Sequence, residues 1–209
     1  MLLTVIIVLA YFIGSIPTAV WLGKRFHGID VRDYGSKNAG ATNTFRILGK
    51  KLGWAVLLID ILKGALCTSL PFFFVDFYIG FKDEELILQL CGGFSSVLGH
   101  VFPVYAGFRG GKGVATSLGI VFGINPLGAL ICLGFFLFIF ISFRFVSLGA
   151  ITAALAFPFI SFFLLREDQR IMIIFTMILS LVVIAAHRKN IRRLLRGEEN
   201  KMNLLKKKA

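Results

Sequence analysis

Residues 107–117 contain side chains and backbone suited to binding a phosphate group. Gly110, Gly111 and Gly113 flank Lys112. Glycine lets the backbone approach a ligand closely. The apolar run that follows predicts a helix beginning directly after Gly113, so free N–H groups and the positive end of a helix dipole would face an anion. This is not a Walker A loop, because Gly113 stands where that motif needs Ser or Thr. Close helix packing is the alternative explanation for the glycines; the enclosed lysine favours the anion site.

Residues 30–46 form a second segment rich in small polar residues. Its short hydrogen-bonding side chains are Ser36, Asn38, Thr42 and Asn43. Arg46 adds a planar guanidinium that can pair with phosphate through two hydrogen bonds. A solvated basic loop is the alternative, but lysines alone would satisfy it. The density of Gly, Asn and Thr favours a binding loop.

The last apolar run continues directly into a basic segment that carries His187 and Asn190. These two residues are three apart, so on a continuous helix they share a face. A histidine at the membrane surface is a candidate general base. The alternative is a basic helix touching anionic lipid, and the lysines at 206–208 fit that alternative well.

Asp60 and Lys63 lie three residues apart inside an apolar run. A charged residue within a span is a functional candidate, and an internal ion pair lowers its cost. A structural role in tying helices together and a catalytic role both fit the pair. For His27 and His100 we expect ordinary interfacial or packing roles.

Composition identifies the setting of these residues as a membrane. The chain has 209 residues, of which 57% are hydrophobic and 16% charged, and its mean hydropathy is +0.84. A soluble domain needs much more polar surface. The net charge of +12 lies between apolar runs, so it indicates membrane topology rather than a nucleic-acid partner. The three cysteines lie in apolar runs without metal-site spacing, so we expect no metal.

The hydropathy pattern predicts seven membrane-spanning segments. Most are long enough to cross a hydrocarbon core of about 30 Å. Residues 114–143 are too long for one span and are divided at Asn125-Pro126, which leaves a short fourth span. Pro17 is expected to kink the first span near its end. The segments are Leu2–Leu22, Gly53–Tyr78, Leu86–Phe108, Val114–Ile124, Leu127–Phe143, Val146–Leu165 and Ile171–Ala186.

Loop charges predict the orientation of this all-α transmembrane bundle. Basic residues cluster after the first, third and last spans, whereas the loops at 82–85 and 166–170 are acidic or balanced. Basic loops stay in the cytoplasm. The N-terminus is therefore expected outside and the C-terminus inside, which requires an odd number of spans. Seven is the preferred count and five the alternative.

Taken together, these segments resemble the bacterial acyl-phosphate:glycerol-3-phosphate acyltransferase family. The matching stretches follow the family's order over nearly the whole chain, and the set is far more specific than any one member. They are Gly14-Ser-Ile-Pro17, Gly35-Ser-Lys-Asn-Ala-Gly-Ala-Thr-Asn43 with Arg46, Asp60-Ile-Leu-Lys-Gly64, Gly99-His-x-Phe-Pro103, Gly110-Gly-Lys-Gly-Val-Ala-Thr116, and His187-x-x-Asn-Ile-x-Arg-Leu with Gly197-x-Glu199-x-Lys201.

The resemblance implies transfer of a fatty acyl group from acyl phosphate to the 1-hydroxyl of glycerol 3-phosphate, the first acylation of phospholipid biosynthesis. The products would be lysophosphatidic acid and phosphate, and no cofactor would be needed. The enzyme would be a single domain over 1–209 in the bacterial inner membrane, with its active site facing the cytoplasm. A soluble enzyme that produces acyl phosphate would be a possible partner.

The resemblance also implies roles for individual residues. The expected catalytic residues are Ser36, Arg46, Lys112, His187 and Asn190. The expected substrate-binding residues are Lys37, Asn38, Thr42, Asn43, Gly110, Gly111, Gly113, Thr116 and Ser117. The expected structural residues are Asp60, Lys63 and Glu199. The proton acceptor stays open between His187 and the departing phosphate.

A membrane transporter of an anionic phosphorylated metabolite is the alternative function. Such a protein also has basic loops and broken helices, but its polar groups lie near the middle of the bilayer. Here we expect most of them at the cytoplasmic edge, which favours an enzyme.

Overall fold

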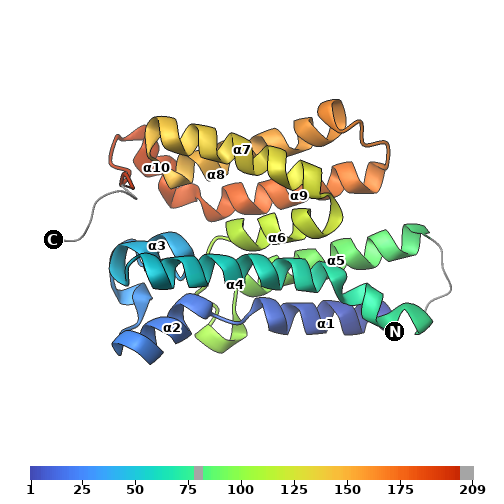
Figure 1. The fold of residues 1–209 in the computed structure, drawn as a ribbon, viewed down its shortest axis with the longest axis horizontal. Helices are drawn as coiled ribbons and strands as arrows, with labels where there is room; N and C mark the ends of the chain where they lie inside the picture. Colours follow the sequence, from blue (N-terminus) through green and yellow to red (C-terminus); the bar gives the residue numbers. More distant parts are fainter. Residues whose placement is uncertain (78–81, 203–209) are drawn as a thin grey trace. The chain divides into compact units, whose positions relative to one another are not determined.

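The computed structural model describes residues 1–77 and 82–202, with side chains except those of 75–77, 82 and 83. All regular structure in these ranges is helical, so the predicted all-α class is confirmed. The chain divides into two compact units, Met1–Pro126 and Leu127–Ala209. Figure 1 identifies the helices by label.

The first unit contains six α-helices within its described residues. Figure 1 shows α1, α4 and α5 running side by side, and α6 packs on α4. The elements are α1 (Leu2–Gly14), α2 (Thr18–His27), η1 (Val31–Asp33), α3 (Ala41–Ile47), α4 (Lys50–Ser69), η2 (Leu70–Phe77), α5 (Lys82–Val101), η3 (Val104–Ala106) and α6 (Val114–Ile124).

Glycines allow these helices to approach one another closely. A Cβ atom added at Gly64 would meet the Thr116 carbonyl, and one added at Gly119 would meet the Ile61 carbonyl. Both positions lie where α4 crosses α6. Small residues at such crossings let helix backbones pack tightly within a membrane.

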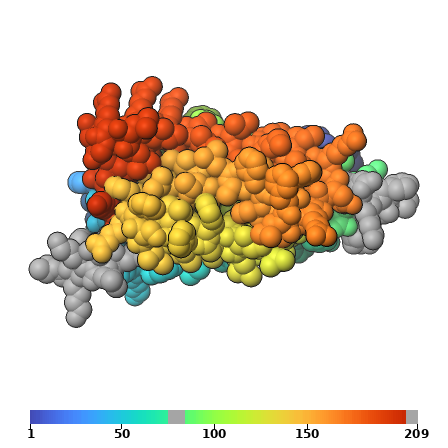
Figure 2. Space-filling model, turned by 90° about the horizontal axis from the view of Figure 1, so that it is seen from above, coloured from blue at the N-terminus to red at the C-terminus, as the bar shows by residue number. Residues whose placement is uncertain are grey.

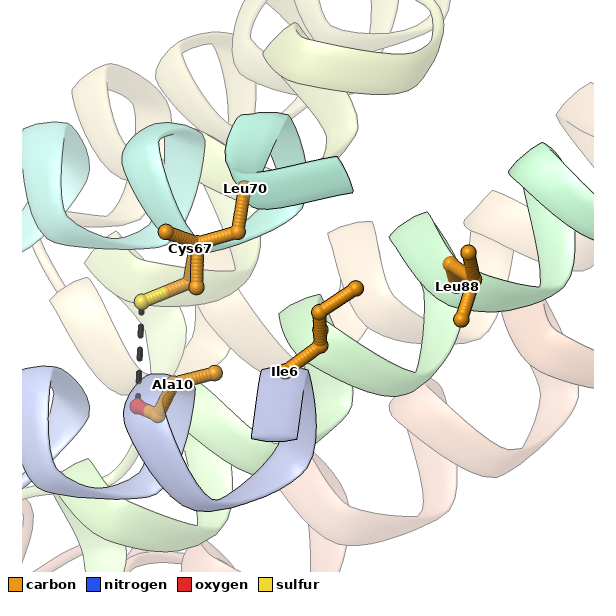
Figure 3. Packing of buried hydrophobic residues seen from close by; sticks show 5 residues of the cluster. All are labelled: Ile6, Ala10, Cys67, Leu70 and Leu88. Atoms are coloured by element: carbon orange, nitrogen blue, oxygen red, sulfur yellow. Dashed lines mark hydrogen bonds between the residues drawn. The ribbon is translucent and has the colours of Figure 1, made fainter. Parts of the chain in front are cut away.

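A buried apolar cluster joins α1, α4 and α5. Figure 3 shows its members Ile6, Ala10, Cys67, Leu70 and Leu88. The Cys67 thiol lies 3.7 Å from the Ala10 carbonyl oxygen and donates to it. Cys67 therefore acts as a small buried hydrophobe with a weak donor.

The kink predicted at Pro17 is confirmed as a complete break. The first helix ends at Gly14 and the next begins at Thr18, although together they form one candidate span, Leu2–His27. Proline has no N–H to donate and its ring clashes with the preceding turn, which interrupts a helix.

Up to residue 202, where its described part ends, the second unit contains four further α-helices. They are α7 (Pro126–Phe143), α8 (Val146–Phe159), continued by the π-helix η4 (Ile160–Leu164), then α9 (Arg170–Ala186) and α10 (Arg188–Leu195). The helix α8 packs on α9, and α10 contacts both. Gly149 lies against Phe136 and brings α8 close to α7. Figure 2 shows one face of this unit, with α7 in yellow and α10 in red at one end.

Within residues 1–77 and 82–202, five helices or helix combinations are long and apolar enough to cross a membrane, and the bent pair α9 and α10 raises the number to six. The short apolar helix α6 lies outside this count. Each of the seven predicted segments nevertheless coincides with helix in the described residues. Tyr78 at the end of the second segment, and the lysines at 206–208, lie outside those residues.

Two boundaries differ from the sequence prediction. Residues 82–85 were expected as a loop, but α5 begins at Lys82. Residues 41–47 were also expected as a loop, but they form α3, so Arg46 lies in a helix. Acidic residues are favourable in a first helical turn, which explains why a charged segment can begin α5.

Candidate functional site

The predicted helix start after the glycine segment, residues 107–113, is confirmed. The helix α6 begins at Val114, and Gly113 precedes it with a φ of +79°. This left-handed conformation is one that glycine adopts without steric cost. The first N–H groups of α6 have no partners within the helix, so they are candidates for anion binding beside Lys112.

Two other amides of the glycine segment are bound to the scaffold instead. The Gly110 N–H donates to the Val101 carbonyl at 3.2 Å, and the Gly111 N–H donates to the His100 carbonyl at 3.1 Å. These two N–H groups are therefore engaged by the end of α5, unlike the first N–H groups of α6 to which the prediction referred. A Cβ atom at Gly110 would meet the His100 carbonyl, and one at Gly111 would meet His100 Nε2. Close packing on the end of α5 thus requires glycine at both positions.

Thr116 and Ser117 lie in the first turns of α6 and are buried. Neither hydroxyl has a hydrogen-bond partner within the described part of the chain. The Thr116 backbone faces Gly64 of α4. An unpartnered buried hydroxyl is uncommon, and the two hydroxyls stay candidates for a polar contact.

Asn43 holds the segment at 30–46 together. Its Oδ1 accepts the Ser36 N–H at 2.9 Å, and its Nδ2 donates to the Val31 carbonyl at 2.7 Å and the Tyr34 carbonyl at 3.2 Å. Both amide donor positions are thereby used within the segment. Asn43 places Ser36, which is partly exposed, and we assign it this positioning role.

The other predicted residues of this segment are accessible. Asn38, Thr42 and Arg46 are partly exposed, and Lys37 is exposed with a φ of +57°. Together with Ser36 they form a hydrogen-bonding surface on the turn before α3 and on α3 itself.

A pair that the sequence reasoning missed fastens this segment to the glycine segment. Arg32 binds the Asp30 carboxylate with two hydrogen bonds of 2.9 and 2.7 Å. Its Nη1 donates to the Ala106 carbonyl at 2.7 Å and to the Arg109 carbonyl at 3.3 Å. The hydrogen bonds from Arg32 lower the pKa of Asp30 to about 2, against the opposing effect of burial. The only signal in the sequence was an acidic residue two positions before an arginine.

The predicted Asp60–Lys63 ion pair is formed and lies inside the helix bundle. Lys63 Nζ is 2.8 Å from Asp60 Oδ1, and their side chains are 5% and 2% exposed. Lys63 also donates to the Ile16 carbonyl at 3.2 Å, and the Thr18 hydroxyl donates to Asp60 at 3.1 Å. His100 Nδ1 lies 3.8 Å from Asp60 Oδ1. The pair thus links α4 to the break between α1 and α2 and lies beside α5.

His187 and Asn190 belong to the second unit, at a bend in the chain. The prediction that a helix continues directly through His187 was wrong, because α9 ends at Ala186 and α10 turns away from it by 62°. Both side chains are buried. His187 Nδ1 lies 2.8 Å from the Val183 carbonyl. A carbonyl only accepts, so Nδ1 carries the proton and Nε2 is the basic nitrogen of the neutral ring.

Glu199 gathers three side chains in the same unit. It accepts hydrogen bonds from Ser147 at 2.8 Å, from Asn190 at 2.7 Å and from Arg193 at 2.7 Å. Burial opposes ionisation, but these three bonds together lower the pKa of Glu199. The arginine among these three partners, Arg193, lies in α10 and forms an ion pair with Glu199. Neither it nor Ser147 was singled out in the sequence, because nothing local marks them as partners of Glu199.

Comparison with known proteins gives the family. Residues 4–197 match the family model for glycerol-3-phosphate acyltransferase. A glycerol-3-phosphate acyltransferase of Fusobacterium nucleatum subsp. nucleatum is 45% identical over 196 residues, covering 93% of this chain and 95% of the relative. One from Chlorobium phaeobacteroides is 43% identical over 229 residues, covering 96% and 97%.

Two solved structures have the same fold. Both are of PlsY (YgiH), an integral membrane glycerol 3-phosphate acyltransferase, in its glycerol 3-phosphate and lysophosphatidic acid forms. The first has a TM-score of 0.86 and 36% identity, and the second a TM-score of 0.83 and 35% identity. Each alignment covers 97% of this chain and 96% of the other. The chain therefore belongs to the glycerol-3-phosphate acyltransferase family of integral membrane proteins.

Proposed function

We propose that this protein transfers a fatty acyl group from acyl phosphate to the 1-hydroxyl of glycerol 3-phosphate, giving lysophosphatidic acid and phosphate. The observation that carries the proposal is the attachment of Arg32 to the Ala106 and Arg109 carbonyls. It fixes a hydroxyl-rich segment beside a glycine segment that contains a lysine. A reaction between two phosphorylated substrates needs two neighbouring anion-binding segments of this kind.

In this proposal the glycine segment binds acyl phosphate. Lys112 and the first amides of α6 neutralise the phosphate, and Gly110, Gly111 and Gly113 allow the close approach. Thr116 and Ser117 supply the unpartnered hydroxyls. Charge that develops on the carbonyl oxygen and the departing phosphate is stabilised by preorganised donors of this type.

Glycerol 3-phosphate is assigned to the segment at 30–46. Arg46 pairs with its phosphate, and Ser36 orients its hydroxyl. Lys37, Asn38 and Thr42 add charge and hydrogen bonds, while Asn43 holds Ser36 in place. For His187 and Asn190, which belong to the second unit, we propose catalytic roles in the same reaction, and Glu199 fixes Asn190.

The chemical step is acyl substitution. The 1-hydroxyl oxygen forms a bond to the acyl carbon, and the bond from that carbon to the bridging oxygen breaks, so phosphate leaves. The hydroxyl proton passes to the departing phosphate or to Nε2 of His187. Acyl phosphate has a good leaving group, so a strongly basic side chain is unnecessary.

We propose seven spans, with the N-terminus outside and the C-terminus in the cytoplasm. The five long spans are supplemented by α9, the apolar half of the bent α9–α10 pair, and by α6, because a short helix is tolerated in a membrane where it packs on protein. An odd number of crossings keeps the basic segments at 30–46, 107–113 and 188–202 on the cytoplasmic side.

The same proposal covers the setting of the enzyme. Both units act as one acyltransferase domain over 1–209 in the bacterial inner membrane, with the site facing the cytoplasm. The acyl chain comes from the bilayer, and a soluble enzyme supplies acyl phosphate.

The test is phosphate release by purified protein in detergent, given palmitoyl phosphate with or without glycerol 3-phosphate. We expect release that depends on glycerol 3-phosphate, with an equal amount of lysophosphatidic acid. Lys112→Met should abolish it, whereas Lys50→Met, at an exposed lysine of α4, should retain it. Turnover with palmitoyl-CoA alone would reassign the donor, and no turnover with either donor would contradict the proposed reaction.

A further inference from the structure

The buried ion pair of α4 is placed where charges are costly. Asp60 and Lys63 lie inside a candidate span, Lys50–Phe74, and are almost completely buried. A charge in such a place is stable only when it is paired and hydrogen-bonded. Replacing a buried ion pair by hydrophobic residues is often neutral for stability. The role of this pair is therefore sought in the groups that it contacts.

One side of the pair holds the helix break before α2. The break at Pro17 leaves carbonyl groups without their usual helical partners, and Lys63 Nζ donates to the carbonyl of Ile16. Thr18, the first residue of α2, donates to Asp60. The pair therefore fixes the start of the helix that leads into residues 30–46.

The other side of the pair reaches the glycine segment through His100. The imidazole Nδ1 lies 3.8 Å from Asp60 Oδ1, which is too long for a direct hydrogen bond, so the ring packs beside the carboxylate. The opposite edge of the ring, at Nε2, occupies the space that a Cβ atom of Gly111 would need. The His100 carbonyl accepts the Gly111 N–H. The ring thus lies between the carboxylate and the glycine segment.

We propose that Asp60, Lys63 and His100 are positioning residues that set the conformation of residues 107–113. The ion pair packs against one edge of the imidazole, and the other edge of the imidazole supports the backbone at Gly111 from within the bundle. A looser segment should bind acyl phosphate more weakly, and this consequence rests on the proposed function. The greater mobility of the backbone at 107–113 does not depend on any substrate.

Three variants test the proposal. His100→Leu removes the polar ring but keeps an apolar side chain, and His100→Gln restores a polar group near the position of Nε2. Ser95→Ala is the matched control, because Ser95 is buried in the same helix and donates to the Ile7 carbonyl at 2.7 Å, away from the glycine segment. The readouts are amide hydrogen exchange of residues 107–113 and the KM values for palmitoyl phosphate and glycerol 3-phosphate.

We expect exchange at 107–113 in His100→Leu to rise by roughly tenfold, because without the imidazole the segment opens more often, and the KM for palmitoyl phosphate to rise by a similar factor. The KM for glycerol 3-phosphate should change less, and His100→Gln should recover part of both effects. Ser95→Ala should lower thermal stability without either effect. Exchange in His100→Leu no faster than in Ser95→Ala would overturn the proposal.

A double variant covers the case in which His100→Leu does not fold. Asp60→Asn combined with Lys63→Met removes both charges at nearly constant volume, a replacement that buried pairs often tolerate. It should accelerate exchange at 107–113, and unchanged exchange there would overturn the proposal. If the unaltered protein fails to use palmitoyl phosphate, the proposed reaction is wrong, while the exchange data still decide the positioning role.

Discussion

The glycine segment at 107–113 and the bend between α9 and α10 are held in different ways. The glycine segment is held mainly by its backbone. Its amides donate to carbonyls at the end of α5, and the atoms around Gly110 and Gly111 leave no space for a Cβ atom. The bend is held by side chains that converge on one carboxylate, Glu199. The first region should therefore be sensitive to added volume, and the second to lost charge.

The largest effect is expected from Gly111→Ala. Its Cβ atom would collide with the His100 ring, so the segment must move, and a displacement of about 1 Å can cost roughly 100-fold in activity. Phosphate release from palmitoyl phosphate measures the loss. Gly134→Ala is the control, because a Cβ atom there meets nothing within 4 Å. Equal activity of Gly111→Ala and Gly134→Ala would contradict the claim that the glycine segment has no space for a side chain at Gly111.

A smaller but substantial loss is expected from Glu199→Gln. The change leaves Arg193 without its carboxylate and weakens the hold on Asn190 and Ser147. Hydrogen bonds to charged groups each contribute about 1.5–3 kcal/mol, so both thermal stability and activity should fall. Glu198→Gln, at an exposed neighbour, should match the unaltered protein. If Glu199→Gln also matched the unaltered protein, the claim that the Glu199 carboxylate holds the bend would be wrong.

Acid pH should weaken the attachment between the segments at 30–46 and 107–113. The pKa of Asp30 is lowered to about 2 from its ordinary 3.8. A lowered pKa stabilises the fold fully above the ordinary value and less as pH falls toward the lowered one. The difference in thermal stability between the unaltered protein and Asp30→Asn should therefore be constant above about pH 5 and shrink between about pH 4 and pH 2. A difference that does not change with pH would contradict this role for the ionised carboxylate.

The smallest effect is expected from Lys24→Gln. Lys24 lies 3.7 Å from Asp30, but its side chain is 60% exposed, and exposed ion pairs contribute about 0–1 kcal/mol. Thermal unfolding in detergent should hardly change, since Arg32 already binds both carboxylate oxygens. A loss as large as that of Asp30→Asn would show that Lys24, and not Arg32, holds the carboxylate.

Sequence reasoning succeeded where the relevant spacing is local. Asp60 and Lys63 are one helical turn apart, and the helix start after Gly113 follows from the glycines and the apolar run. The roles of Arg32 were not predictable, because its carbonyl partners are 74 and 77 residues away and a carbonyl has no sequence signature. The bend at His187 was missed because helix-forming residues continue on both sides of it.

The measurement that tests the central claim most directly uses palmitoyl phosphate labelled with ¹⁸O at the bridging oxygen. Acyl substitution breaks the bond between the acyl carbon and that oxygen, so the account predicts that mass spectrometry finds the label in the released phosphate and none in lysophosphatidic acid. Label retained in palmitate, with unlabelled phosphate released, would show cleavage at phosphorus and contradict an acyl transfer to glycerol 3-phosphate.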